Sequence, residues 1–139
     1  MDFSSINPIG IAVATLAGFV IGALWFSPKT FFTMWWKAMG KGDAQPGDGQ
    51  NMGVVFASLV VALIIQAVVL SGLINGLYDH SASVAQGVLV GAVLGLGISA
   101  MHSLGHRLFA GQGWLVWALE IGNDVVAAMG MAAIITLIN

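Results

Sequence analysis

The sequence predicts an all-α integral membrane protein, a bundle of four transmembrane helices with a short interfacial helix after the first helix. Hydrophobic residues make up 58% of the 139 residues and charged residues only 7%, whereas soluble domains are about a quarter charged. The chain also contains four long apolar stretches, and about 20 helical residues cross the hydrocarbon core of a bilayer. Strands with open edges would leave backbone groups unpaired in lipid, so the stretches are predicted to be helices of one membrane domain over residues 1–139.

The first predicted helix covers about residues 8–26. Asn7 is a suitable N-cap and Pro8 suits the first helical position, while Ser27-Pro28 ends the segment. A cleavable signal peptide is the alternative for this segment, but no basic region leads it and no small-residue cleavage site follows it. The other three predicted helices cover about residues 53–74, 84–104 and 114–138.

The connection after the first helix is predicted to hold a short interfacial helix over about residues 29–40. Phe31, Trp35 and Met39 recur at helical spacing, while Lys29 and Lys37 fall on another face, as in helices that lie at the headgroup level. The alternative is an aromatic belt with lysines that reach toward water. Residues 42–51 form a predicted polar linker. The aromatic residues predicted at the membrane interface are Trp25, Phe31, Trp35, Trp36 and Trp114.

The basic residues predict how the chain lies across the membrane. Lys29, Lys37 and Lys41 lie between the first two helices and Arg107 lies between the last two. The two terminal segments and the connection over residues 75–83 contain no Lys or Arg. Because cytoplasmic loops are enriched in Lys and Arg, we expect both basic loops in the cytoplasm and both termini outside.

Small residues recur every four positions in two of the predicted helices, which places them on one helix face. Such stripes let helices approach closely in a membrane. They serve either packing within one four-helix bundle or a seam between copies in a homo-oligomer, and the sequence leaves both open. The first stripe is Gly10, Ala14, Gly18 and Gly22, and the second is Ser83, Gly87, Gly91, Gly95, Ser99 and Ser103.

The last predicted helix contains a polar cluster. Glu120, Asn123 and Asp124 share one face at spacings of three and four. Asp124 falls roughly 15 Å into the membrane, near its midplane, where a charge costs about 2.5–3.5 kcal/mol on insertion scales. These residues, with Gln66 near the middle of the second helix, are therefore candidates for binding a proton or a cation. The alternative is that protonated acids only hold neighbouring helices together.

Two histidines end the third predicted helix. His102 and His106 share one face, and counting along two regular antiparallel helices places Glu120 within a turn of His102. Two imidazoles and a carboxylate could coordinate zinc or a similar ion, or pass a proton inward from Asp124. The alternative is that both histidines lie at the headgroup boundary beside Arg107.

Several short motifs resemble the domain-of-unknown-function 1761 family. Trp25-Phe26-Ser27-Pro28, with the aromatic residues that follow it, resembles the family's signature after the first helix, and Leu108-Phe109 fits its tail. The resemblance extends over nearly the whole chain and implies four helices in a bacterial inner (cytoplasmic) membrane, with no established activity. Glu120 and Asp124 depart from the family pattern, so the resemblance implies no role for them. The further matching positions are Phe31, Trp35, Lys37, Met39-Gly40, Ile121-Gly122-Asn123 and Met129-Gly130.

Composition excludes nucleic-acid binding and cysteine chemistry. A net charge of −2 with only four Lys and Arg residues leaves no basic face for nucleic acid. The absence of cysteine excludes disulfides and thiolate metal sites. The predicted partners are the lipid bilayer and a candidate second copy of the chain. No cofactor is predicted, apart from a candidate bound cation.

Three functions are compatible with these residues. The first is a small oligomeric transporter or channel, coupled to protons or cations through Asp124 and Glu120. The second is a structural or accessory membrane protein without a substrate. The third is a metal-dependent intramembrane enzyme using His102, His106 and Glu120, which is the least favoured because the chain has no nucleophile elbow and no HExxH motif.

Overall fold

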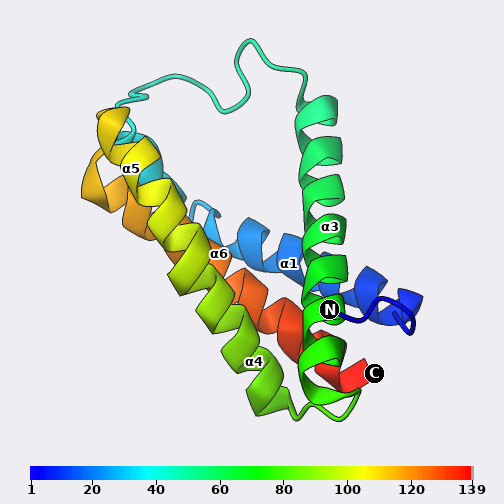
Figure 1. Cartoon of the computed structure of the whole chain (residues 1–139). Coiled ribbons are helices and arrows are strands. Elements are labelled where there is room, and N and C mark those ends of the chain that lie inside the picture. Colours follow the sequence, from blue (N-terminus) through cyan, green and yellow to red (C-terminus); the bar gives the residue numbers. More distant parts are fainter. Residues whose placement is uncertain (139) are drawn as a thin grey trace.

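The structure, a computed structural model, describes residues 1–138, and the regular secondary structure of these residues is all helical (Figure 1). Four long helical segments are apolar enough to cross a membrane, which confirms the predicted fold class. Three are the helices α1 (Pro8–Trp25), α3 (Met52–Tyr78) and α6 (Gly113–Ile138), and the short α2 (Phe32–Ala38) follows α1. The third spanning segment in chain order is divided into α4 (Val84–Val93), the π-helix η1 (Leu94–Ala100) and α5 (Met101–Phe109).

The helix boundaries follow from local capping. The Asn7 side chain accepts hydrogen bonds from the Ile9 and Gly10 amides at 3.0 and 3.3 Å, and Asn51 caps α3. Two helices run further than the sequence predicted. α3 continues past Ile74 to Tyr78, and the third spanning segment continues to Phe109, because neither extension contains proline and glycine alone does not stop a helix.

α6 is the central helix and contacts every other helical element. The contact of α4 and η1 with α6 is close because small residues of these two elements lie directly on the α6 backbone. A Cβ added at Gly91 would lie 2.6 Å from the Ala128 carbonyl oxygen, and one added at Gly95 would lie 3.0 Å from Val125 Cα. Within one chain, this stripe is therefore used to pack α4 and η1 against α6. A homo-oligomeric seam stays a prediction.

The buried core occupies one half of the bundle. Its residues come from α1, α3, α4 and α6, and lie toward the end that holds both termini. By contrast, residues 52–62 of α3 are all exposed. Figure 1 shows this half of α3 standing apart from α5 and α6, joined to α2 by the long linker. The most deeply buried residues of this cluster are Ala14, Ala67, Leu70, Ile74, Met131, Ala132 and Ile135, and Ala100 and Val116 are buried as deeply outside it.

The terminal segments are tied to the closed end of the bundle. The Asp2 amide donates to the Gly72 carbonyl at 2.8 Å, and the Asn7 side chain donates to the Ile138 carbonyl at 3.2 Å. The Asp2 carboxylate pairs with His80 at 3.0 Å. Hydrogen bonds from the Ser4 hydroxyl and amide, with a smaller effect of His80, lower the pKa of Asp2 to about 2. Asp2 is therefore charged at neutral pH.

Candidate functional site

The two acidic residues of α6 lie in different surroundings. Glu120 is largely buried, with its side chain 18% exposed, and its Oε2 lies 2.6 Å from Arg107 Nε. Its other oxygen, Oε1, accepts a hydrogen bond from the Trp35 indole at 3.1 Å. Both carboxylate oxygens are thus engaged, by residues of α5 and α2. Glu120 holds these two helices against α6.

Removing the partner of Glu120 is expected to destabilise the protein. Arg107→Ala leaves a largely buried carboxylate without its cation, which we expect to lower the free energy of unfolding by about 2 kcal/mol. Adding Glu120→Gln removes the stranded charge and keeps an acceptor for Trp35, so the double variant is expected to recover part of this loss. Unfolding in mixed detergent micelles measures both variants. Strictly additive losses would contradict the pairing.

Asp124, one turn further along α6, has no such cation. The Asn123 amide donates to Asp124 Oδ1 at 3.3 Å. Among residues 1–138, no basic side chain forms an ion pair with the Asp124 carboxyl. The predicted pair of acids is therefore divided: Glu120 is paired with Arg107, whereas Asp124 forms no ion pair among residues 1–138, and its role as a proton or cation site stays a prediction.

Asp124 lines a cavity of about 710 Å³ between α1, α2, α3, η1 and α6, within the usual range for small-molecule sites of roughly 300–1,000 Å³. The polar lining consists of Asp124, Asn123, Gln66 and Ser99. The first three are predicted site residues, and Ser99 belongs to the second stripe of small residues. The Trp35 indole is also part of the wall. The rest of the lining is Gly18, Phe19, Gly22, Ala23, Phe26, Phe32, Met52, Phe56, Leu59, Ala62, Leu63 and Ala127.

The cavity is closed at its deep end and open near the basic end of the bundle. At one end Gly18 and Leu63 line the cavity, and a Cβ added at Gly18 would lie 3.0 Å from Leu63 Cδ2 and 2.7 Å from Sδ of the core residue Met131, so this contact forms its floor. Beyond this floor lies the rest of the buried core. Toward the other end, Met52 and Phe56 of α3 are partly exposed. The cavity therefore runs from the end that carries the linker to about the middle of the bundle.

Aromatic rings form two groups in the wall of the cavity. Phe19 of α1 and Phe56 of α3 have ring centroids 6.3 Å apart. Phe26 lies 5.0 Å from Trp35, measured between centroids. Because Trp35 donates to Glu120, the Arg107–Glu120 pair also fixes the orientation of an aromatic ring in the wall.

The contact between α1 and α6 sets the position of Asn123. The Trp25 indole donates to the Leu119 carbonyl at 2.9 Å. Gly122 makes room for that ring, since an added Cβ would lie 2.6 Å from Trp25 Cζ2. Gly22 lies opposite Asn123, at 3.7 Å from an added Cβ to Oδ1. Trp25, predicted at the membrane interface, is thus hydrogen-bonded to α6 within the bundle.

The π-helix η1 brings Ser99 to the cavity. π-Helical turns are rare and frequently occur at functional sites. η1 spans seven residues, Leu94–Ala100, and the Trp117 indole donates to the Ala100 carbonyl at 3.0 Å. This hydrogen bond from α6 satisfies a carbonyl at the end of the π-helix. The sequence did not predict η1, although two glycines in LGLGISA weaken the regular helix there.

The structure does not assemble the predicted metal site. His102 and His106 are exposed, with ring centroids 5.1 Å apart, while Glu120 is bound to Arg107 and Trp35. Among the described residues 1–138, no three His, Asp or Glu side chains lie close enough to hold a metal ion. Metal binding by His102, His106 and Glu120 stays a prediction without geometric support.

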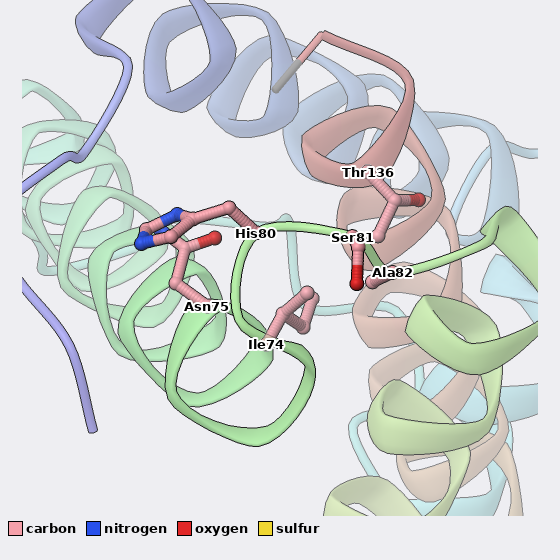
Figure 2. Close-up of a pocket in the computed structure, with 6 residues that line it drawn as sticks. All are labelled: Ile74, Asn75, His80, Ser81, Ala82 and Thr136. Atoms are coloured by element: carbon pink, nitrogen blue, oxygen red, sulfur yellow. The ribbon is translucent and has the colours of Figure 1, made fainter.

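A second, smaller cavity of about 210 Å³ lies at the closed end, where α3 turns into α4. Figure 2 shows Asn75 and His80 on one side of it and Ser81 and Thr136 on the other. His80 already pairs with Asp2 and lies within hydrogen-bonding distance of Ser5. The smaller cavity lies beside the contacts that anchor the terminal segments, and its His80 is already engaged by Asp2. The larger cavity is therefore the candidate functional site.

The chain matches a known protein family over most of its length. The model of a family described as "Protein of unknown function (DUF1761)" matches residues 9–136. The chain belongs to this family. The match confirms the resemblance seen in the sequence, and it includes every residue that lines the large cavity. No curated protein and no solved structure matches the chain.

For this member of the DUF1761 family, three features of the site were missed from the sequence. One is the Arg107–Glu120 pair, another is the π-helix, and the third is the aromatic wall made by α1 and α3. Phe19 and Phe56 looked like ordinary membrane-helix residues. Only the divergence of α3 from α6 gives their rings a cavity to face.

Proposed function

We propose that the protein is a small proton- or cation-coupled transporter in which Asp124 is the coupling group. The observation that carries this proposal is the position of Asp124, which lines a cavity of about 710 Å³ and forms no ion pair with any basic side chain of the described part of the chain, residues 1–138. Acidic residues inside membrane segments commonly mark ion pathways and proton relays. Protonation would neutralise Asp124 and let the site empty, and deprotonation would let it bind a cation.

The shape of the cavity supports a carrier more than a channel. A channel needs a continuous path, whereas the floor at Gly18, Leu63 and Met131 closes this cavity at mid-bundle. A carrier exposes its site to one side at a time. The exposed half of α3 and the packed core half correspond to the open and closed sides of such a carrier.

We also propose that the open side faces the cytoplasm of a bacterial cell. Lys29, Lys37, Lys41 and Arg107 all belong to the end where the cavity opens, and cytoplasmic loops are enriched in basic residues. Both termini then lie outside. The inner membrane is the corresponding location.

A structural or accessory role is the second candidate, and one observation favours it. The Glu120 carboxylate is fully occupied by Arg107 and Trp35, as expected for a group that holds helices together. Asp124 separates the two functions, because a purely structural protein needs no titratable group there. Proton movement by the reconstituted protein, with and without Asp124→Asn, tests the transporter.

A further inference from the structure

We infer that the substrate of the proposed transporter is a lipophilic organic cation, a molecule with one positive charge and an aromatic or bulky apolar body. This inference rests on the proposed function and names the chemistry that its cavity recognises. The cavity offers one carboxyl group, at Asp124, inside a wall that is otherwise mainly apolar and aromatic. The oxygens of Asp124, Asn123, Gln66 and Ser99 suit a small inorganic ion as well, but such an ion would leave the aromatic wall and most of the volume of the cavity unused.

Charge complementarity selects the sign of the ligand. Of the residues that the structure describes, those that accompany Asp124 as polar groups in the cavity are the neutral Gln66, Ser99 and Asn123. The nearest other charges are Glu120 and Arg107, which pair with each other. The cavity-lining parts of α1, α3 and η1 contain no ionisable side chain, and Lys37 of α2 is exposed. The net field of the site therefore favours a monovalent cation.

The aromatic wall selects the body of the ligand. Phe19 and Phe56 form one group of rings in the wall, and Phe26, Phe32 and Trp35 form another. Ring faces attract cations and pack well against flat apolar groups. The volume of about 710 Å³ admits a drug-sized molecule.

The exposed half of α3 gives such a ligand a route from the lipid. Phe56 and Leu59 line the cavity and are also 49% and 44% exposed. In a bilayer these side chains meet acyl chains, so the cavity communicates with the region where lipophilic cations accumulate. A strongly hydrated ion has no access by this side.

Binding of tetraphenylphosphonium to the purified full-length protein in detergent tests the inference. We expect saturable binding that weakens as the pH falls, because protons compete for Asp124. Tetraphenylborate has the same shape and the opposite charge, and tetramethylammonium has the charge without the aromatic body. We expect the affinity for each of these control ions to be lower than that for tetraphenylphosphonium by a factor of about ten or more. Equal binding of either control ion would overturn the inference.

Substitutions locate the binding site. Asp124→Asn is expected to weaken tetraphenylphosphonium binding about tenfold or more, and Phe56→Leu about threefold. Phe56→Trp keeps an aromatic face and is expected to retain affinity, which separates ring chemistry from misfolding. Phe109→Leu, at a ring that is 98% exposed and outside the cavity, is the matched control and should not change binding. Unchanged affinity in both Asp124→Asn and Phe56→Leu would place the ligand elsewhere and overturn the inference.

The outcomes distinguish the substrate class from the transport function. If tetraphenylphosphonium does not bind while sodium or potassium still drives Asp124-dependent proton movement, the substrate class is wrong and the transporter stands. If tetraphenylphosphonium binds through Asp124 but no cation drives proton movement, the binding site stands and the transporter fails.

Discussion

Asp124→Asn is expected to abolish cation-driven proton movement in proteoliposomes while leaving the fold intact. Asparagine keeps the size of the side chain and its hydrogen bonding, but it cannot take up a proton. The Asp124 side chain lines the cavity, and within residues 1–138 the side-chain hydrogen bond that it accepts is the one from Asn123 at 3.3 Å, so little packing depends on its charge. A pH-sensitive dye trapped inside the vesicles reports proton movement when gradients of inorganic and organic cations are applied.

The control for this variant is Asp43→Asn. Asp43 is an exposed acid in the polar linker, outside every cavity described above. We expect wild-type flux from Asp43→Asn and the flux of protein-free vesicles from Asp124→Asn. Wild-type flux in both variants would remove Asp124 from the mechanism. No cation-driven flux with the wild-type protein would contradict the transporter itself.

Gly91→Ala is expected to have the largest effect on stability. The added Cβ would lie 2.6 Å from the Ala128 oxygen and 2.9 Å from Met129 Cα, and these backbone atoms cannot rotate away. α4 would have to move off α6, and overpacking of this kind costs about 1–3 kcal/mol. Unfolding of the detergent-solubilised protein by increasing fractions of a denaturing detergent measures the loss.

Gly105→Ala is the matched control. Gly105 lies in α5 of the same spanning segment, and nothing lies within 4 Å of an added Cβ. Alanine has a higher helix propensity than glycine by about 1 kcal/mol, so this variant should be as stable as the wild type or more stable. If the two variants lose the same stability, close packing on α6 is not the reason for the glycine stripe.

The fold class could be predicted from the sequence because it depends on local quantities. The lengths of the apolar stretches, the caps at Asn7 and Pro8 and the scarcity of charges are each readable without tertiary contacts. The stripe at Gly87, Gly91 and Gly95 predicted a close helix contact. It could not name the contacting helix, because a small residue carries no information about its neighbour.

The surroundings of Glu120 could not be predicted, and the π-helix explains part of the reason. Counting along regular α-helices placed His102 within a turn of Glu120. A π-helix forms i→i+5 hydrogen bonds, so η1 changes the direction of every side chain that follows it. In the structure His102 is exposed and Arg107 reaches Glu120.

The cavity also lay beyond sequence reasoning. The polar face of Glu120, Asn123 and Asp124 was readable from spacing, and Gln66 was a sensible partner at mid-membrane. The space between them depends on how far the first half of α3 diverges from α6. That divergence is a balance of packing over the whole bundle, and no local pattern encodes it.

Cysteine accessibility tests most directly whether Asp124 is reached from one side. The chain contains no cysteine, so single substitutions give a clean signal with a charged, membrane-impermeant thiol reagent. Gln66 lines the cavity, whereas its neighbour Ala67 is fully buried in the core. We predict fast modification of Gln66→Cys from the side of the basic loops only, and no modification of Ala67→Cys from either side. Equal protection of both positions from both sides would contradict an open cavity at Asp124.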